Sequence, residues 1–62
     1  MANVRIPPLT TAQAAKYLGV SVATLRRWSN EGIGPREIRY SDRVRRYEVY
    51  ELEQFKRRHE RA

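Results

Sequence analysis

The chain lacks cysteine and has one histidine among its 62 residues. Without cysteine there is no disulfide and no thiolate ligand for a metal ion, and a single histidine does not build a histidine-based metal site. Very small domains often depend on such cross-links. We therefore expect a domain that holds together through its packed core alone, with no metal and no cofactor.

Long apolar runs are also missing. No stretch approaches the roughly 20 residues that span a bilayer, and residues 1–5 lack the apolar segment of a signal peptide. We therefore expect a cytoplasmic protein that makes no membrane contact. At 7.4 kDa the chain has room for one small domain and too little for a large enzyme pocket.

The residue combinations that enzymes use are absent as well. The sequence offers no nucleophile with a nearby base, no carboxylate pair in a plausible pocket and no glycine-rich phosphate loop. Catalysis is not expected. What the chain does have is positive charge, with 13 Lys and Arg against 7 Asp and Glu, for a net charge of +6. This balance favours a polyanionic partner.

The prolines at positions 7 and 8 oppose a helix and favour an extended lead-in. We assign residues 1–8 to an N-terminal arm and residues 9–62 to one folded domain. Thr10 and Gln13 have the spacing of a capping box and predict that a first helix begins there. Gly19 is suited to end this helix in a left-handed conformation.

A second helix is predicted to follow after a very short turn. Ser21 is a favourable N-cap only two residues after Gly19, and this spacing is typical of a helix-turn-helix. Leu25 and Trp28 fall on one side of the second helix, so we assign Trp28 to the core rather than to a platform for stacking bases. Two glycines and a proline in residues 32–35 end the helix.

The rest of the domain is predicted to be a short hairpin and a third helix. Alternating residues between positions 36 and 47 predict two strands, with a turn at Ser41 and Asp42. Leu52 and Phe55, with Tyr50 and His59, indicate a helix that frays from Lys56 onward. The fold class is mainly α with a small β-hairpin: a winged helix-turn-helix of three helices and a two-stranded wing. The remaining aromatic residues assigned to the core are Tyr17, Tyr40, Tyr47 and Phe55.

The start and outward face of the second helix form the first candidate binding surface, because such a helix can enter the DNA major groove. Arg27 lies nearly opposite Leu25 and Trp28, and we assign it to base contacts. Arg26 lies on the flank, where it can follow the backbone or brace the wing. The alternative is a basic surface helix that only keeps the protein in solution. The candidate residues are Ser21, Ala23, Thr24, Arg26, Arg27 and Asn30.

The hairpin is the second candidate surface, since its five arginines exceed what protection of a sheet edge requires. A wing beside a recognition helix reaches the adjacent minor groove or backbone, where arginine is favoured. The candidates are Arg36, Arg39, Arg43, Arg45 and Arg46. The basic residues 56–58 and Arg61 are interpreted either as a solvated helix end or as a surface for a protein or for another phosphate.

Several segments together resemble the phage excisionases, within the MerR-like winged-helix superfamily. The segments are LTTAQAA at 9–15, LGVS at 18–21, TLRRW at 24–28, Gly32, Gly34 and Pro35, RY at 46–47 and LEQF at 52–55, and the resemblance covers residues 9–57. It implies that the helix after Ser21 is the recognition helix and that the hairpin is the wing. It also implies that Arg46 faces a phosphate or braces the wing, and that Tyr47 is buried. Two departures are Tyr50, where a Ser or Asp cap is usual, and Ser41 and Asp42, where a glycine is common.

The resemblance also implies a function. An excisionase, or recombination directionality factor, binds tandem direct repeats in attachment-site DNA, bends that DNA and contacts the phage integrase in the cytoplasm of the bacterial host. We expect cooperative binding through self-association along the DNA. The first alternative is a small phage or mobile-element transcription regulator with the same fold, which the residues do not distinguish from an excisionase. The second is a protein-interaction module or an RNA binder.

Overall fold

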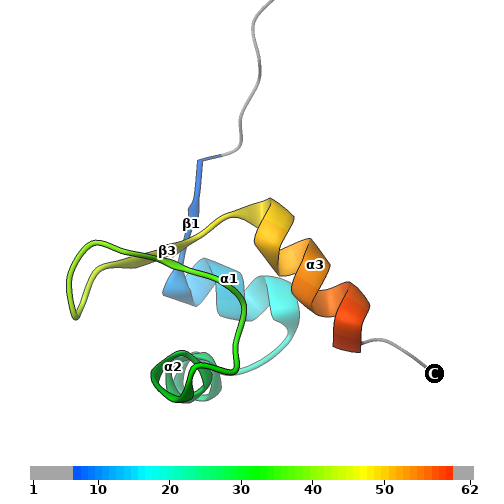
Figure 1. The fold of residues 1–62 in the computed structure, drawn as a ribbon, viewed down its shortest axis with the longest axis horizontal. Coiled ribbons are helices and arrows are strands. Elements are labelled where there is room, and N and C mark those ends of the chain that lie inside the picture. The colour runs from blue at the N-terminus through cyan, green and yellow to red at the C-terminus, as the bar shows by residue number, and fades with distance from the viewer. Residues whose placement is uncertain (1–6, 60–62) are drawn as a thin grey trace, which may run out of the picture.

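The computed structural model describes residues 7–59. Three helices and a small sheet follow one another in the order β1 (Leu9–Thr10), α1 (Thr11–Leu18), α2 (Val22–Glu31), β2 (Ile38–Arg39), β3 (Arg45–Tyr47) and α3 (Val49–His59) (Figure 1). This is the predicted arrangement of three helices and a hairpin. None of the helices in residues 7–59 is long and apolar enough to cross a membrane.

The two predicted caps of α1 are confirmed. The Thr10 hydroxyl accepts a hydrogen bond from the Gln13 N–H at 3.1 Å, and the Gln13 side chain accepts one from the Thr10 N–H at 3.0 Å. At the other end, Gly19 has a φ of 80° and its N–H donates to the Ala15 and Lys16 carbonyls. A residue with a Cβ would be strained at this φ, so glycine allows the chain to turn immediately toward α2.

The start of α2 is also capped by a side chain. The Ser21 hydroxyl accepts the Thr24 N–H at 3.0 Å, as predicted for an N-cap. The helix ends before Gly32, and Gly34 then passes so close to the helix that a Cβ there would lie 3.1 Å from Trp28 Cβ. The tight connections before and after α2 hold the helix at a defined angle to the rest of the domain.

The sheet has three strands rather than the two that the sequence predicted. Their order is β1-β3-β2, and both pairs are antiparallel. The additional strand arises because Thr10 is extended as the N-cap of α1, which lays Leu9 beside Tyr47 and Thr10 beside Arg46. The N-terminal lead-in therefore covers one edge of β3 from Leu9 onward. Residues 1–6 of the predicted arm lie outside the described residues.

The core lies where α1, α2, α3 and β3 meet. Its fully buried side chains are Ala14, Ala15, Leu25, Tyr47 and Leu52, and Phe55 is nearly buried. Tyr17 and Trp28 pack against this cluster as partly buried side chains, in agreement with their assignment to the core. The two small alanines of α1 allow the neighbouring elements to approach closely.

One aromatic assignment to the core was wrong. Tyr40 is 66% exposed, because β2 ends at Arg39 and the chain has already left the sheet at Tyr40. Tyr50 lies in α3, as predicted, but on the exposed side of the helix, while Leu52 and Phe55 face the core. Within the described residues, α3 also extends through the segment predicted to fray, as far as His59.

The capping box of α1 gives a test of the fold. Thr10→Ala is expected to lower the free energy of unfolding by about 1 kcal/mol, because the Gln13 N–H loses its acceptor. Chemical denaturation measures the change. Thr10→Ser keeps the hydroxyl and is expected to stay near the parent stability; an equal loss in both variants would contradict the cap as the cause.

Candidate nucleic-acid interface

The outward face of α2 carries the four predicted residues Ala23, Arg26, Arg27 and Asn30, all of which are exposed. At about 100° per residue these side chains cover one continuous side of the helix, opposite the buried Leu25. Of the two arginines, Arg26 lies on the side toward the wing. The helix therefore presents a polar and basic face that no other described element covers.

Ser21 and Thr24 have structural tasks at the start of α2. The Ser21 hydroxyl donates to Thr24 Oγ1 at 2.9 Å in addition to accepting the Thr24 N–H. Both hydroxyls are thereby oriented within the first turn of the helix. Ser21 is exposed and Thr24 half-buried, so the prediction that they touch DNA concerns the edge of the helical face rather than its centre.

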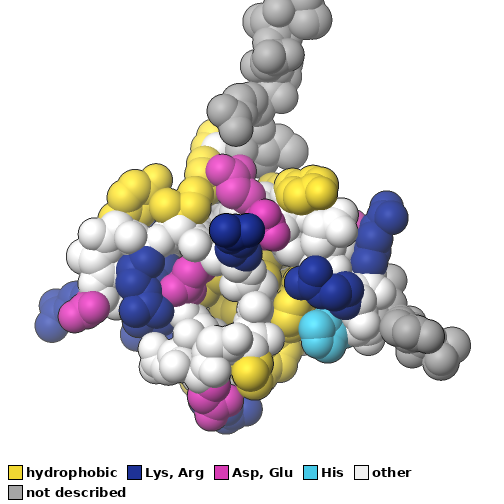
Figure 2. Space-filling model, viewed as in Figure 1, with side chains coloured by type: hydrophobic (Ala, Val, Ile, Leu, Met, Phe, Trp, Pro, Cys, Tyr) yellow, Lys and Arg dark blue, Asp and Glu magenta, His cyan; other side chains and the backbone are white. Residues whose placement is uncertain are grey.

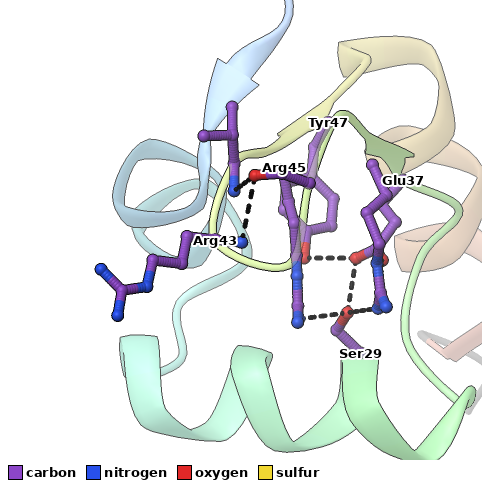
Figure 3. A network of polar contacts seen from close by, with 8 residues as sticks. Ser29, Glu37, Arg43, Arg45 and Tyr47 are labelled. Atoms are coloured by element: carbon purple, nitrogen blue, oxygen red, sulfur yellow. Dashed lines mark hydrogen bonds and ion pairs between the residues drawn. The ribbon is translucent and has the colours of Figure 1, made fainter.

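The tip of the wing is shaped by Ser41 in place of the more common glycine. Its hydroxyl accepts the N–H groups of Arg43 at 3.3 Å and Val44 at 3.1 Å, and the Tyr40 N–H donates to the Val44 carbonyl at 2.9 Å. A serine side chain that accepts backbone N–H groups closes a turn without a positive φ. The exposed Arg43 lies at this tip, and its side chain extends out from the wing (Figure 3).

A groove of about 210 Å³ separates α2 from the wing and joins the two candidate surfaces; we call it the helix–wing groove. Its lining residues come from the start of α1, from α2, and from the wing: Thr11, Arg26, Asn30, Asp42, Arg43 and Arg45. Three arginines and one carboxylate give this groove a net positive charge. The groove thus brings together side chains up to 34 positions apart in the sequence.

The wing is tied to α2 by a network around the Glu37 carboxylate. The Ser29 hydroxyl donates to Glu37 Oε1 at 2.5 Å, and the Tyr47 hydroxyl donates to the same oxygen at 3.1 Å. Arg39 pairs with Glu37 Oε2 through Nε at 3.0 Å and Nη2 at 2.9 Å, while Arg45 Nη1 donates to Ser29 Oγ at 2.8 Å. Figure 3 shows Arg45 and Tyr47 reaching from β3 toward Ser29 on α2.

The network also shifts two pKa values. Burial alone would raise the pKa of Glu37, but hydrogen bonds from Ser29, Arg39 and Tyr47, together with the charge of Arg39, outweigh it and lower the pKa. Burial raises the pKa of Tyr47, and its hydrogen bond to Glu37 adds to this effect. Glu37 is therefore held as a carboxylate, which its arginine partner requires.

The five predicted wing arginines occupy different environments. Arg43 is exposed and Arg45 half-buried, and both line the helix–wing groove. Arg39 is engaged with Glu37, and Arg36 lies beside the end of α2, outside that groove. Arg46 is half-buried on the other face of the sheet from Arg45, and its Nη1 donates to the Arg45 carbonyl at 3.0 Å. The structure therefore brings Arg43 and Arg45, but not the whole set, into the helix–wing groove.

Two helices joined by a tight turn, with a basic hairpin beside the second helix, define the helix-turn-helix class of DNA-binding domains with a wing. Residues 8–60 match the helix-turn-helix domain family, and the chain belongs to this family. It is accordingly a DNA-binding domain, of a class that is typically not enzymatic. Neither the curated proteins nor the solved structures gave a match to the chain.

The sequence did not reveal Ser29, Glu37 or Thr11 as parts of the interface. A signal was present, since an acidic residue two positions before an arginine in a strand faces the same side of the sheet. The partners Ser29 and Tyr47, however, lie 8 and 10 positions away and meet Glu37 only in the folded chain.

Glu37 provides a test with a defined pH dependence. Glu37→Ala is expected to cost about 1–3 kcal/mol at pH 7, because hydrogen bonds to a charged group are lost. Since the folded state lowers the pKa of Glu37 below 4.5, its contribution is complete above about pH 4.5 and is lost as the pH falls through the folded pKa.

Denaturation curves of the parent and of Glu37→Gln between pH 7 and pH 3 measure this dependence. The stability difference between the two proteins is expected to shrink as the pH falls. A difference that stays constant over the whole range would show that the ionised carboxylate does not carry the network.

Proposed function

We propose that the domain inserts α2 into the major groove of double-stranded DNA while the wing contacts the adjacent backbone or minor groove. The observation that carries this proposal is the helix–wing groove, in which Arg26 and Asn30 of α2 face Arg43 and Arg45 of the wing. A phosphate backbone that passes along this groove lies between the two elements and meets guanidinium groups from both. Arginine is suited to phosphate because its planar fork donates two parallel hydrogen bonds.

Within this interface we assign different tasks to the predicted residues. Arg27, together with Ala23 and Asn30, lies on the outermost side of α2 and is proposed to face base edges. Arg26 and Arg43 are proposed to bind backbone phosphates from the two sides of the groove. Ser21 and Thr24 lie at the start of the helix, and Arg36, Arg39 and Arg46 add to the positive charge of the wing.

We further propose that the protein acts as an excisionase. This step is supported by the resemblance of residues 9–57 to that family and by the compact winged helix-turn-helix domain that the structure describes. In this role the protein binds tandem direct repeats of attachment-site DNA, self-associates along them, bends the DNA and directs the phage integrase toward excision. Bending costs a few kcal/mol, which the basic contacts and the contacts between neighbouring protomers offset.

A small phage or mobile-element transcription regulator is the second candidate, because a regulator needs the same groove contacts. A footprint of the purified protein, at physiological salt, on attachment-region DNA and on the promoters of neighbouring genes tests both. Regularly spaced protection of the attachment arm with a mobility shift that reports a bend supports the excisionase. Protection confined to a promoter supports the regulator, and no specific protection on either DNA contradicts both.

Arg27 tests the assignment to bases. Arg27→Ala is expected to relax discrimination at one base pair and to lose about 1–3 kcal/mol of binding free energy on the parent site. Competition binding with all single-base variants of the site measures this. Arg27→Lys keeps the charge but loses the two-pronged contact, so it is expected to relax the same position; unchanged discrimination in both variants would contradict a base contact.

Arg43 tests the contact of the wing with phosphates. Arg43→Ala is expected to weaken binding to all sequences alike and to lower the slope of log K against log salt by roughly one unit. Affinity measured at several salt concentrations gives the slope. Lys16→Ala, which removes an exposed charge of α1 outside the helix–wing groove, serves as the matched control. Equal slopes for the parent and Arg43→Ala would show that the wing tip does not touch phosphates.

A further inference from the structure

A second groove lies on the other side of α2 and is not part of the DNA interface. It has a volume of about 230 Å³ and is lined by the end of α1, the turn between α1 and α2, one residue of α2 and the last turns of α3. We call it the aromatic groove; its lining residues are Leu18, Val20, Trp28, Phe55, Lys56 and His59.

The walls of the aromatic groove are apolar and well ordered by contacts among themselves. The Trp28 and Phe55 rings lie 5.6 Å apart, and the His59 ring lies 4.2 Å from that of Phe55. His59 Nδ1 is 2.8 Å from the Phe55 carbonyl oxygen, which ties the ring to the helix backbone. Phe55 is nearly buried and Trp28 half-buried, so the groove offers a recessed aromatic surface, of the kind that receives an anchoring side chain of a protein partner.

The size of the groove favours a protein side chain over a small molecule. Pockets for drug-sized ligands usually measure about 300–1,000 Å³, whereas this groove has about 230 Å³. It is deep enough for one or two apolar side chains. A metabolite would also require several convergent polar groups, and four of the six lining side chains are hydrocarbon or indole surface.

The aromatic groove stays open when DNA is bound, because Trp28 lies on the opposite side of α2 from the helix–wing groove. Trp28 lies about 200° around the helix from both Arg26 and Asn30, which line the helix–wing groove. An occupant of the aromatic groove therefore does not compete with DNA in the proposed orientation. This step rests on the proposed function, while the groove itself does not.

The charge around the groove indicates the chemistry of its occupant. Lys56 and His59 line it, and Arg57 and Arg58 are exposed in the same last turn of α3. Figure 2 shows the histidine beside basic side chains over this end of α3. Glu53, the acidic residue one turn before, accepts a hydrogen bond from the Tyr17 hydroxyl and keeps its negative charge, so this end of α3 carries one carboxylate against the three cations Lys56, Arg57 and Arg58. The rim is thus positive around an apolar floor.

We propose that the aromatic groove binds a short acidic segment of a partner protein, with one apolar side chain against Trp28 and Phe55 and carboxylates facing Lys56 and the end of α3. Complementary charge of this kind selects the partner and speeds its association, while the buried apolar side chain supplies most of the affinity. The domain then links a protein to DNA through opposite sides of one helix.

The test selects peptides from a random library displayed on phage, with the free domain as the target. Enriched peptides with an apolar residue flanked by Asp or Glu are expected. Trp28, the single tryptophan of the chain, reports binding of the synthetic peptides by a change in its fluorescence. No enrichment, enrichment of basic peptides, or binding that leaves Trp28 fluorescence unchanged overturns the proposal.

Two charge-reversal variants locate the site. Lys56→Glu is expected to weaken the selected peptides by about fivefold to tenfold, because an attractive rim charge becomes repulsive. Lys16→Glu makes the same change outside the groove and is expected to bind like the parent. Val20→Thr, which places a hydroxyl in the floor, is expected to weaken binding while thermal unfolding confirms that it folds. Equal binding by the parent, Lys56→Glu and Val20→Thr overturns the proposal.

The same peptides separate this proposal from the proposed function. Binding to the free domain and to its complex with DNA with equal affinity supports both the groove and the proposed orientation of α2. Binding that DNA abolishes supports the groove but contradicts that orientation. Sedimentation of the domain alone gives a further check, since a dimer that Lys56→Glu disrupts would make a second copy the occupant and overturn the proposal.

Discussion

The position of the wing depends on one carboxylate between two guanidinium groups. Arg39 and Arg45 are direct partners across β2 and β3, and like charges in this arrangement are destabilising. Glu37 pairs with Arg39, and Ser29 links Glu37 to Arg45. Glu37 thereby offsets the repulsion between the two arginines, and its hydrogen bond with Ser29 connects the sheet to α2. A ladder of only two residue pairs would otherwise hold the wing weakly at its angle to the helix.

This constraint separates the arginines into two groups with different physical tasks. Arg39 and Arg45 have their guanidinium groups engaged within the protein, and the buried Nε of Arg45 has no hydrogen-bond partner among residues 7–59. Leaving a buried donor unpaired costs about 1–3 kcal/mol, so Arg45 stabilises the domain less than its contacts suggest. Arg26, Arg27 and Arg43 are exposed and keep their donors available for a ligand. A count of positive charges in the sequence does not distinguish these groups.

How far the sequence predicts the structure depends on the range of the interactions. The caps at Thr10, Gly19 and Ser21 were predictable because each involves residues within four positions of one another. The strand at Leu9 and Thr10 was not, since it depends on β3, whose partner residues lie 38 and 36 positions away in the register. Tyr40 was misplaced for a related reason: alternation predicts a face of a strand but not where the strand ends.

The two proposed surfaces share one helix because the domain is small. Leu25 faces the core, Arg26 and Asn30 face the helix–wing groove, and Trp28 faces the aromatic groove, so successive residues of α2 serve three different environments. A helix of 10 residues can do this only if its orientation is fixed from both ends, by the Ser21 cap and by the close passage of Gly34 over Trp28. A rotation of α2 that improved one surface would then misplace the other. The two proposed surfaces therefore both depend on the packing of this single helix.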